Sequence, residues 1–405
     1  MQTSLADFIK QSPEGQEADA ILRKCVHCGF CLATCPTYQL LGDELDSPRG
    51  RIYLVKQLVE GQPVSEKTQM HLDRCLTCRA CETTCPSGVT YHRLADIGRK
   101  LTEERVSRPP RQKLLRWGLR KVIPHRNRFI PLLRIGQALR GALPSALRDK
   151  VPERRTSGPW PITEHPRKML ILDGCVQPGI DPGINAATAR VLDRLGISLV
   201  STPQAGCCGA VSYHLNAQQE GLETMRRLID AWWPAIEAGA ETIIITATGC
   251  ASTIKEYGHL LADDPDYREK AKRVSDMAVD IGELLAREDL AALGRVEGQR
   301  IAFHSPCTLQ HALKLNGVVE NVLKRLGFEL TPVPDAHLCC GSAGTYSITQ
   351  RDLSLQLREN KLRNLTSGEP RLIATANIGC LSHLQGGTKL PVLHWIEAVD
   401  RALAG

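Results

Sequence analysis

Residues 25–36 read CVHCGFCLATCP, and residues 75–86 read CLTCRACETTCP. In each stretch three cysteines follow one another at two-residue gaps, a fourth comes after three more residues, and a proline closes the run. This spacing is typical of proteins that bind iron–sulfur clusters. Zinc sites instead pair two ligands from one short knuckle with two from a distant one. The double run therefore predicts two 4Fe–4S clusters, with structural zinc and a disulfide lattice as the alternatives.

In such runs the first three cysteines bind one cluster and the fourth binds the other. This rule predicts one cluster on Cys25, Cys28, Cys31 and Cys85, and a second on Cys75, Cys78, Cys81 and Cys35. Residues 47–61, between the two runs, are expected to form a helix with Ser47 as its N-cap and Pro48 as its first residue. We therefore expect residues 1–104 to form an α-helical ferredoxin domain.

Residues 168–405 contain an internal repeat. In each copy short β-branched runs alternate with amphipathic helical patterns, which favours an α/β lobe with parallel strands. Each copy also repeats a set of four cysteines, namely Cys175, Cys207, Cys208 and Cys250 in the first and Cys307, Cys339, Cys340 and Cys380 in the second. Ligands bind beyond the carboxyl ends of the strands in open α/β sheets. We therefore expect each copy to gather its four thiols on one rim, as an additional metal or redox site.

The predicted lobes span residues 168–290 and 291–405. In the first lobe one long helix is expected over 213–239, after the paired cysteines. The predicted fold class is thus an α-helical ferredoxin domain followed by α/β, with two pseudo-repeated lobes of parallel strands and helices.

Residues 105–167 contain no cysteine and are predicted to form a basic helical connector and linker. Residues 111–144 space their apolar side chains at helical intervals, and the prolines at 124, 131 and 144 are expected to break them into short helices. Residues 152–167 contain several prolines and are predicted to be a linker.

The net charge of +7 is concentrated between Arg105 and Lys168. This basic block predicts a docking face for partner subunits, a membrane-surface helix or a solvated linker face. Trp117 and Phe129 fit a helix that lies on a membrane. Nucleic-acid binding is not expected, because no nucleic-acid-reading motif is present.

The first residues, MQTSLADFIK, lack the basic and then apolar pattern of a signal peptide. No stretch reaches eighteen uncharged apolar residues, so no transmembrane helix is expected. We expect a cytoplasmic protein that is peripheral on the inner face of the cytoplasmic membrane. In that reducing compartment its 16 cysteines are expected to bind metal or to carry out redox chemistry.

The double cysteine run, residues 46–55 (DSPRGRIYLV), and the motifs AGCCGAVSYHLNAQ (205–218) and HLCCGSAGTY (337–346) resemble iron–sulfur subunits built from a ferredoxin domain and CCG domains. This family includes subunits of glycolate oxidase, anaerobic glycerol-3-phosphate dehydrogenase, a lactate-oxidation system and heterodisulfide reductase. The chain is most similar to the glycolate oxidase type, and the resemblance covers nearly all of it.

The resemblance implies an electron-transfer subunit of an oxidoreductase complex. Flavin-binding partner subunits would oxidise glycolate to glyoxylate, and this chain would pass the electrons towards a membrane quinone. The sequence has no G-x-G-x-x-G fingerprint after a strand, so FAD is expected only in the partner subunits, and no catalytic residue is predicted here. The alternatives are the equivalent glycerol-3-phosphate or lactate dehydrogenase subunit, a heterodisulfide-reductase-like thiol/disulfide enzyme, and a regulatory iron–sulfur sensor.

The CCG motifs depart from part of the family pattern. In heterodisulfide reductase the CCG site ends in C-x-x-C, whereas residues 250–253 read CAST and residues 380–383 read CLSH. The missing fifth thiol leaves it open whether the CCG cysteines hold a cubane, another metal or no metal.

Four histidines lie near predicted ligands. His27 is expected to be a solvent-facing loop residue, with tuning of the cluster potential as the alternative. His304 and His311 are expected to be packed polar residues, with a supporting role beside Cys307 as the alternative, and His383 is expected to be a surface or capping residue, with replacement of the missing thiol as the alternative.

Overall fold

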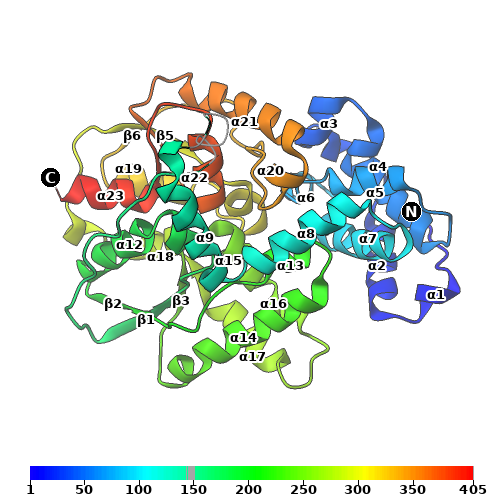
Figure 1. The fold of residues 1–405 in the computed structure, drawn as a ribbon, viewed down its shortest axis with the longest axis horizontal. Coiled ribbons are helices and arrows are strands. Elements are labelled where there is room, and N and C mark those ends of the chain that lie inside the picture. The colour runs from blue at the N-terminus through cyan, green and yellow to red at the C-terminus, as the bar shows by residue number, and fades with distance from the viewer. Residues whose placement is uncertain (143, 145–150, 405) are drawn as a thin grey trace. The chain divides into compact units, whose positions relative to one another are not determined.

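The computed structural model describes residues 1–142, 144 and 151–404 (Figure 1). These residues form two compact units, of which the first contains residues 1–117 and 337–361 and the second contains the remaining described residues. Residues 143 and 145–150 of the predicted connector, and Gly405 of the predicted second lobe, lie outside the described residues. The domain boundaries given by the sequence remain predictions.

The first unit is helical. It contains α1 (Asp7–Lys10), α2 (Pro13–Lys24), α3 (Pro36–Leu41), α4 (Pro48–Val59), α5 (Glu66–Asp73), α6 (Ala80–Thr83), α7 (Tyr91–Arg105), the first part of α8 (Pro110–Val122), α20 (Tyr346–Thr349), the first part of α21 (Arg351–Thr366), and the 3₁₀ turns η1 (Phe30–Leu32) and η2 (Glu44–Asp46). The apolar faces of α2, α4 and α7 meet in a core that includes the fully buried Leu22, Val55 and Leu94. The predicted α-helical ferredoxin fold is confirmed.

Helix α4 begins where the sequence predicts. The Ser47 hydroxyl accepts a hydrogen bond from the Gly50 amide at 3.0 Å, and Pro48 is the first helical residue. A Cβ atom at Gly50 would lie 2.0 Å from the Glu44 carbonyl oxygen. The chain can therefore turn from η2 into α4 this tightly only because residue 50 is glycine.

Helices α4 and α7 cross at close range. A Cβ atom at Gly98 of α7 would lie 2.4 Å from Cγ2 of Val55 on α4. The missing side chain at residue 98 thus sets the separation of the two helices that carry the core of the first unit.

The second unit contains two four-stranded parallel sheets. The first has the order β2-β1-β3-β4, with β1 (Arg167–Ile171), β2 (Ile197–Ser201), β3 (Ile243–Ile245) and β4 (Ala278–Asp280); the second has the order β6-β5-β7-β8, with β5 (Arg300–His304), β6 (Glu329–Leu330), β7 (Leu372–Thr375) and β8 (Val392–His394). The matching strand orders confirm the predicted pair of α/β lobes. The sequence did not predict the fourth strand of either sheet.

Helices pack around these sheets (Figure 1). They are α9 (Arg126–Ala138), η3 (Arg140–Ala142), α11 (Gln177–Ile180), α12 (Gly183–Asp193), α13 (Ala210–His214), α14 (Gln218–Glu237), α15 (Thr248–Lys255), α16 (Tyr257–Leu260), α17 (Arg268–Met277), α18 (Ile281–Arg287), η4 (Ala291–Leu293), η5 (Thr308–Ala312), α19 (Val318–Arg325), α22 (Ile378–Gln385) and α23 (Trp395–Leu403). No helix among the described residues combines the length and the apolar character that crossing a membrane requires.

Two helix predictions were wrong. The single helix expected over 213–239 is two helices, α13 and α14. They are separated because Asn216 adopts a left-handed conformation (φ 63°), which reverses the chain and brings Gly221 into contact with Tyr213. Pro131 does not break the connector, since α9 runs through it. The carbonyl that loses its partner to Pro131 belongs to Asn127, which is exposed, so water can satisfy it. Pro124, by contrast, does separate α8 from α9.

Candidate metal centres

The first predicted ligand set lines one pocket. Cys25 and Cys28 come from the loop between α2 and η1, Cys31 lies in η1, and Cys85 comes from the turn after α6. Together with Cys81 they line a pocket of about 440 Å³, here called the first cysteine pocket. The loop curls because His27 (φ 56°) and Gly29 (φ 87°) both adopt left-handed conformations. His27 itself is half-buried and lines the pocket.

The second predicted set lines a separate pocket. Cys35, Cys75, Cys78 and Cys81 line a pocket of about 360 Å³, here called the second cysteine pocket. The left-handed residues of this run are Thr77 (φ 51°) and Arg79 (φ 61°), at the same positions relative to the cysteines as His27 and Gly29. Non-glycine residues pay a conformational cost there, and such strain clusters at functional sites.

The two pockets share a wall. Pro48, Cys81 and Tyr91 line both of them, and all three residues are buried. Among the described residues, no aspartate or glutamate lines either pocket. Soft thiolate donors without competing carboxylates are the ligands that iron–sulfur clusters take, so the residues fit such a group.

The thiols themselves favour a bound cation. Burial raises the pKa of Cys31 to about 11, and the neighbouring thiol of Cys25 adds to the shift. Burial raises the pKa of Cys81 well above its ordinary value, with further contributions from Cys78 and Cys75. Several thiolates are therefore costly to hold together in these pockets unless metal offsets their charge.

Cys75 behaves differently from its neighbours. Burial raises its pKa, but the guanidinium groups of Arg51 and Arg99, together with hydrogen bonding, leave the pKa below its ordinary value. The second cysteine pocket is therefore the more electropositive environment for at least one of its thiols.

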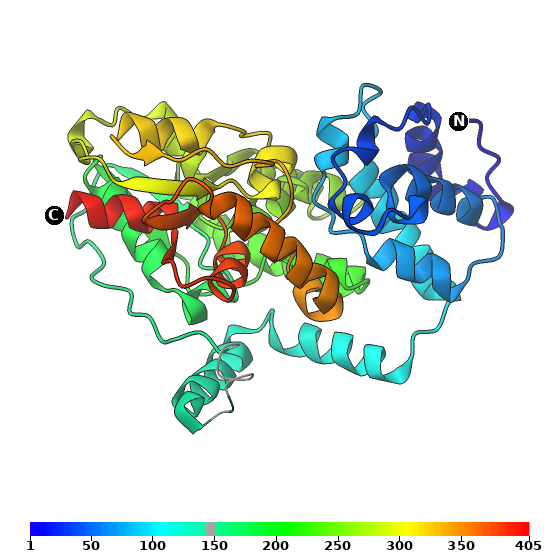
Figure 2. The same cartoon turned by 90° about the horizontal axis from the view of Figure 1, so that it is seen from above.

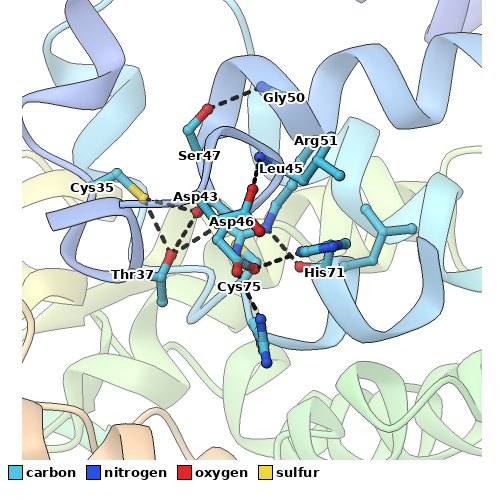
Figure 3. Close-up of polar contacts among 12 residues, drawn as sticks. Cys35, Thr37, Asp43, Leu45, Asp46, Ser47, Gly50, Arg51, His71 and Cys75 are labelled. Carbon is cyan, nitrogen blue, oxygen red and sulfur yellow. Dashed lines mark hydrogen bonds and ion pairs between the residues drawn. The ribbon is translucent and has the colours of Figure 1, made fainter. Parts of the chain in front are cut away.

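Arg51 belongs to a largely buried network of charges, which we call the Asp46 network: Asp46, Arg51, His71 and Arg74. Figure 3 shows Asp46, Arg51 and His71 close together. Asp46 Oδ1 lies 3.2 Å from Arg51 Nη2 and 3.1 Å from His71 Nδ1, while its Oδ2 lies 2.8 Å from Arg74 Nη1. The motif DSPRGR marked this segment in the sequence, but nothing there indicated that Asp46 pairs with residues of α5 and the turn after it.

Thr37 connects the Asp46 network to a predicted cluster ligand. Its hydroxyl donates to the Asp46 carbonyl oxygen at 2.8 Å, accepts from Arg51 Nη1 at 3.1 Å, and lies 3.3 Å from the Cys35 sulfur (Figure 3). The network thus touches the second ligand set at Cys35 as well as near Cys75.

The structure brings the four cysteines of the first CCG copy together. Cys175 follows β1, the pair Cys207–Cys208 follows β2, and Cys250 lies in α15 after β3. The Cys207 side chain contacts those of Cys175 and Cys208, and Cys208 contacts Cys250. The Gly209 amide (φ 86°) donates to the Cys207 sulfur at 3.4 Å. These four thiols therefore form one cluster at the carboxyl ends of the strands, in which Cys175, Cys207 and Cys208 are buried and Cys250 is half-buried, while metal binding there stays a prediction.

The cysteines of the second copy fall in different units. Cys339 and Cys340 belong to the first unit, and Cys307 and Cys380 belong to the second. The Gly341 amide donates to the Cys339 sulfur at 3.4 Å, as Gly209 does in the first copy. The Asn377 amide nitrogen donates to the Cys380 sulfur at 3.4 Å. That all four gather in one site remains a prediction.

The remaining histidines are packed to different degrees. His304 is buried and its Nδ1 lies 2.9 Å from the Thr375 hydroxyl. His311 is buried in η5, and His383 is half-buried on α22. Burial is compatible both with a packed role and with a role beside the cysteines, so the expectation for His304 and His311 stays a prediction.

Comparisons with known proteins agree with this arrangement. A 4Fe-4S dicluster domain model matches residues 21–89, and a cysteine-rich domain model, CCG, matches residues 169–255 and 301–385. The chain is 59% identical over 404 residues to the glycolate oxidase iron-sulfur subunit of Escherichia coli K12, covering 100% of this chain and 99% of that protein. It is 30% identical over 412 residues to a probable glycolate oxidase iron-sulfur subunit of Bacillus subtilis 168, covering 94% and 91%.

Two more distant likenesses extend the comparison. Lactate utilization protein A of Geobacillus kaustophilus is 29% identical over 230 residues, which cover 54% of this chain and 92% of that protein. The crystal structure of a hypothetical protein from Helicobacter pylori superposes with a TM-score of 0.56 at 12% identity, covering 98% of this chain and 75% of that one. The latter likeness is one of fold alone.

Proposed function

The chain belongs to the family of glycolate oxidase iron–sulfur subunits, and from this premise we propose that it carries electrons from flavin-binding partner subunits, which oxidise glycolate to glyoxylate, towards a membrane quinone. The observation that carries the proposal is the pair of cysteine pockets with a common wall of Cys81 and Tyr91. When bound, 4Fe–4S clusters accept and donate single electrons.

The flavin partner is required on chemical grounds. A 2-hydroxy acid gives up two electrons together, whereas an iron–sulfur cluster takes one, so a flavin must stand between them. No dinucleotide fingerprint occurs in this sequence. The flavin is therefore proposed to lie in another subunit, and this chain holds the electron-carrying groups.

We propose the ligand sets Cys25, Cys28, Cys31, Cys85 and Cys75, Cys78, Cys81, Cys35, and a further metal on the thiols of the first CCG copy. Total iron on anaerobically purified chain tests both parts. Two clusters alone require about eight irons per chain, and a loaded CCG site raises that figure. Cys175→Ser should lower the iron content only in the latter case, and the exposed Ser157→Ala serves as the control. About eight irons in both variants would contradict the CCG metal.

The membrane contact is proposed for the outer face of α9. Figure 2 shows this helix, coloured teal, at the edge of the second unit. Leu132, Ile135 and Leu139 are each more than half exposed, whereas Phe129, Ile130 and Leu133 pack against Gly179 of α11. An apolar face in an arginine-rich helix suits the surface of an anionic bilayer.

Vesicle flotation tests this contact. The double variant Leu132→Ser/Ile135→Ser should lose binding to vesicles that contain anionic lipid, while Ile162→Ser, at a linker residue that is 97% exposed, should not. If the same fraction of the double variant and of the unmodified chain floats with the vesicles, α9 is not the membrane face.

The substrate is tested on the whole complex. The complex is purified through this subunit from its native host, and dye reduction is measured with glycolate, D-lactate, L-lactate and glycerol 3-phosphate in parallel. Glycolate should give the fastest reduction, and flavin should copurify. The likeness to lactate utilization protein A makes a lactate-oxidising complex the second candidate, which faster reduction by lactate would favour.

A further inference from the structure

The Asp46 network places surplus positive charge behind the second cysteine pocket. The single carboxylate of Asp46 forms ion pairs with two guanidinium groups, those of Arg51 and Arg74, so positive charge exceeds negative charge here. Asp46 is 0% exposed and Arg51 is 1% exposed, so water and salt screen little of this charge. Arg51 also lines the second cysteine pocket.

Arg99 adds a second buried cation on the same side. Its guanidinium donates to the Cys75 carbonyl at 2.6 Å, to the Thr77 hydroxyl at 2.8 Å and to the Leu72 carbonyl at 3.1 Å. Its ion pair with Asp96 is long, with 3.9 Å between Arg99 Nη1 and Asp96 Oδ1. Arg99 therefore holds the start of the second cysteine loop mainly through neutral acceptors, which leave its charge in place.

The first cysteine pocket has a different electrostatic setting. Its lining arginine, Arg49, pairs one to one with Glu44 at 2.8 Å, and both side chains are at least one-third exposed. The Met1 ammonium donates to the Cys25 carbonyl at 2.8 Å. Val26 and Phe30, on the loop, are 68% and 61% exposed. Arg49 is paired and open to water, and the Met1 ammonium is only half-buried, so the effect of these charges on the pocket is weaker.

We propose that the buried arginines make the second cysteine set the electron-accepting end of the ferredoxin domain, with a reduction potential above that of the first set. The inference rests on the ligand sets proposed above. One electron leaves the first site, which is oxidised, and enters the second, which is reduced, and no bond or proton changes place. The added negative charge is stabilised at the second site because Arg51 and Arg99 lie in a dry, weakly screened environment. These arginines are positioning and tuning residues.

The next stretch of chain on this side supports that direction. Tyr346 of α20, which follows the paired thiols Cys339 and Cys340, is buried, and its hydroxyl donates to the Arg74 carbonyl at 3.2 Å. Within the first unit, the segment that bears the second CCG pair is therefore anchored beside Cys75. The exposed Val26 and Phe30 mark the opposite pocket as the one open to a donor.

The test is a redox titration of the anaerobic full-length chain, followed by electron paramagnetic resonance. Arg99→Gln should raise the ratio of oxidised to reduced second site at least tenfold at a fixed applied potential. For a one-electron couple this corresponds to a reduction potential that is lower by about 59 mV. Asp46→Asn should move the same signal to the positive side, because a negative charge is removed. Arg49→Gln is the matched control and should leave this signal in place. Arg74→Gln, at a side chain that is 26% exposed, replaces Arg99→Gln if that variant does not fold.

Opposite shifts in the higher-potential signal would support the inference, because a loosened structure would move it in one direction in both variants. Unchanged potentials, equal shifts of both signals, or shifts confined to the lower-potential signal would overturn it. Failure of the ligand sets is distinguishable, since the unmodified chain would then show fewer than two cluster signals.

Discussion

The contact between Gly98 and Val55 yields a quantitative prediction for the first unit. In Gly98→Ala the new methyl group would lie 2.4 Å from Val55 Cγ2 and 3.3 Å from Cγ1, so the two helices must shift. Overpacking of this kind costs about 1–3 kcal/mol. Replacing glycine inside a helix returns about 1 kcal/mol. We expect a net loss of about 1 kcal/mol in the free energy of opening α4 and α7.

The companion variant works in the opposite sense. Val55→Ala removes two methyl groups from a fully buried side chain and should cost about 2 kcal/mol, counting transfer and cavity. In the double variant the methyl group introduced by Gly98→Ala occupies the space that Val55 vacates, so the overpacking disappears and the helix gain remains. The double variant should therefore lose only about 1 kcal/mol, against about 3 kcal/mol for the sum of the single changes.

Hydrogen–deuterium exchange of peptides from α4 and α7, under anaerobic conditions, measures these opening free energies. A coupling of about 2 kcal/mol corresponds to roughly 30-fold slower exchange than additivity gives. Gly118→Ala on α8, where a Cβ atom meets nothing within 4 Å, is the control and should not slow or speed exchange in α4. The reasoning is refuted if the free-energy loss of the double variant equals the sum of the two single losses within about 0.5 kcal/mol.

Three further variants test local features. Ser47→Ala removes the N-cap of α4 and should cost about 1 kcal/mol, seen as faster exchange in its first turn; unchanged exchange there would contradict the capping role. Burial raises the pKa of Asp280 to about 7 from 3.8, with a smaller push from Glu283, so the protonated carboxyl contributes stability that is complete below about pH 4 and lost as the pH rises through 7. After correction for intrinsic rates, β4 and α18 should exchange faster at pH 8 than at pH 5, and Asp280→Asn should flatten this dependence. The Tyr257 hydroxyl donates a hydrogen bond to the Cys208 carbonyl at 2.7 Å, and Tyr257→Phe removes this donor. The variant should destabilise the first CCG lobe by about 1–2 kcal/mol in thermal melts. An unchanged melting temperature would show that water replaces the hydroxyl.

Local sequence signals predicted those parts of the fold that local forces determine. The cap at Ser47 and the strand β3, which lies in the β-branched run TIIIT (242–246), are set by short-range chemistry. Strands β4 and β8 have three residues each, and their extended form comes from pairing with β3 and β7 rather than from their own sequence. A pattern of that length cannot be told from a loop.

The candidate sites, too, were predictable only in the parts that neighbouring residues determine. The spacing of the cysteines predicted which sulfurs would line each pocket, because neighbouring residues on a tight loop must surround one space. The Asp46 network was not predictable, since Asp46 meets Arg74 across 28 positions of sequence. Such a pairing depends on how η2 and α5 pack, and an isolated Asp or Arg in a sequence is most often a solvated surface residue.

The composition of the first unit has a consequence for biosynthesis. Residues 337–361 complete this unit, although 220 positions (337 − 117) separate their start from Trp117. At about 5–20 residues per second, a ribosome needs roughly 10–45 s to cross that interval. During this time the Arg74 carbonyl has no Tyr346 hydroxyl to bond, and the cysteine loops stand without their last packing segment. The first unit therefore cannot reach its final packing until the segment that follows the second CCG pair has been made.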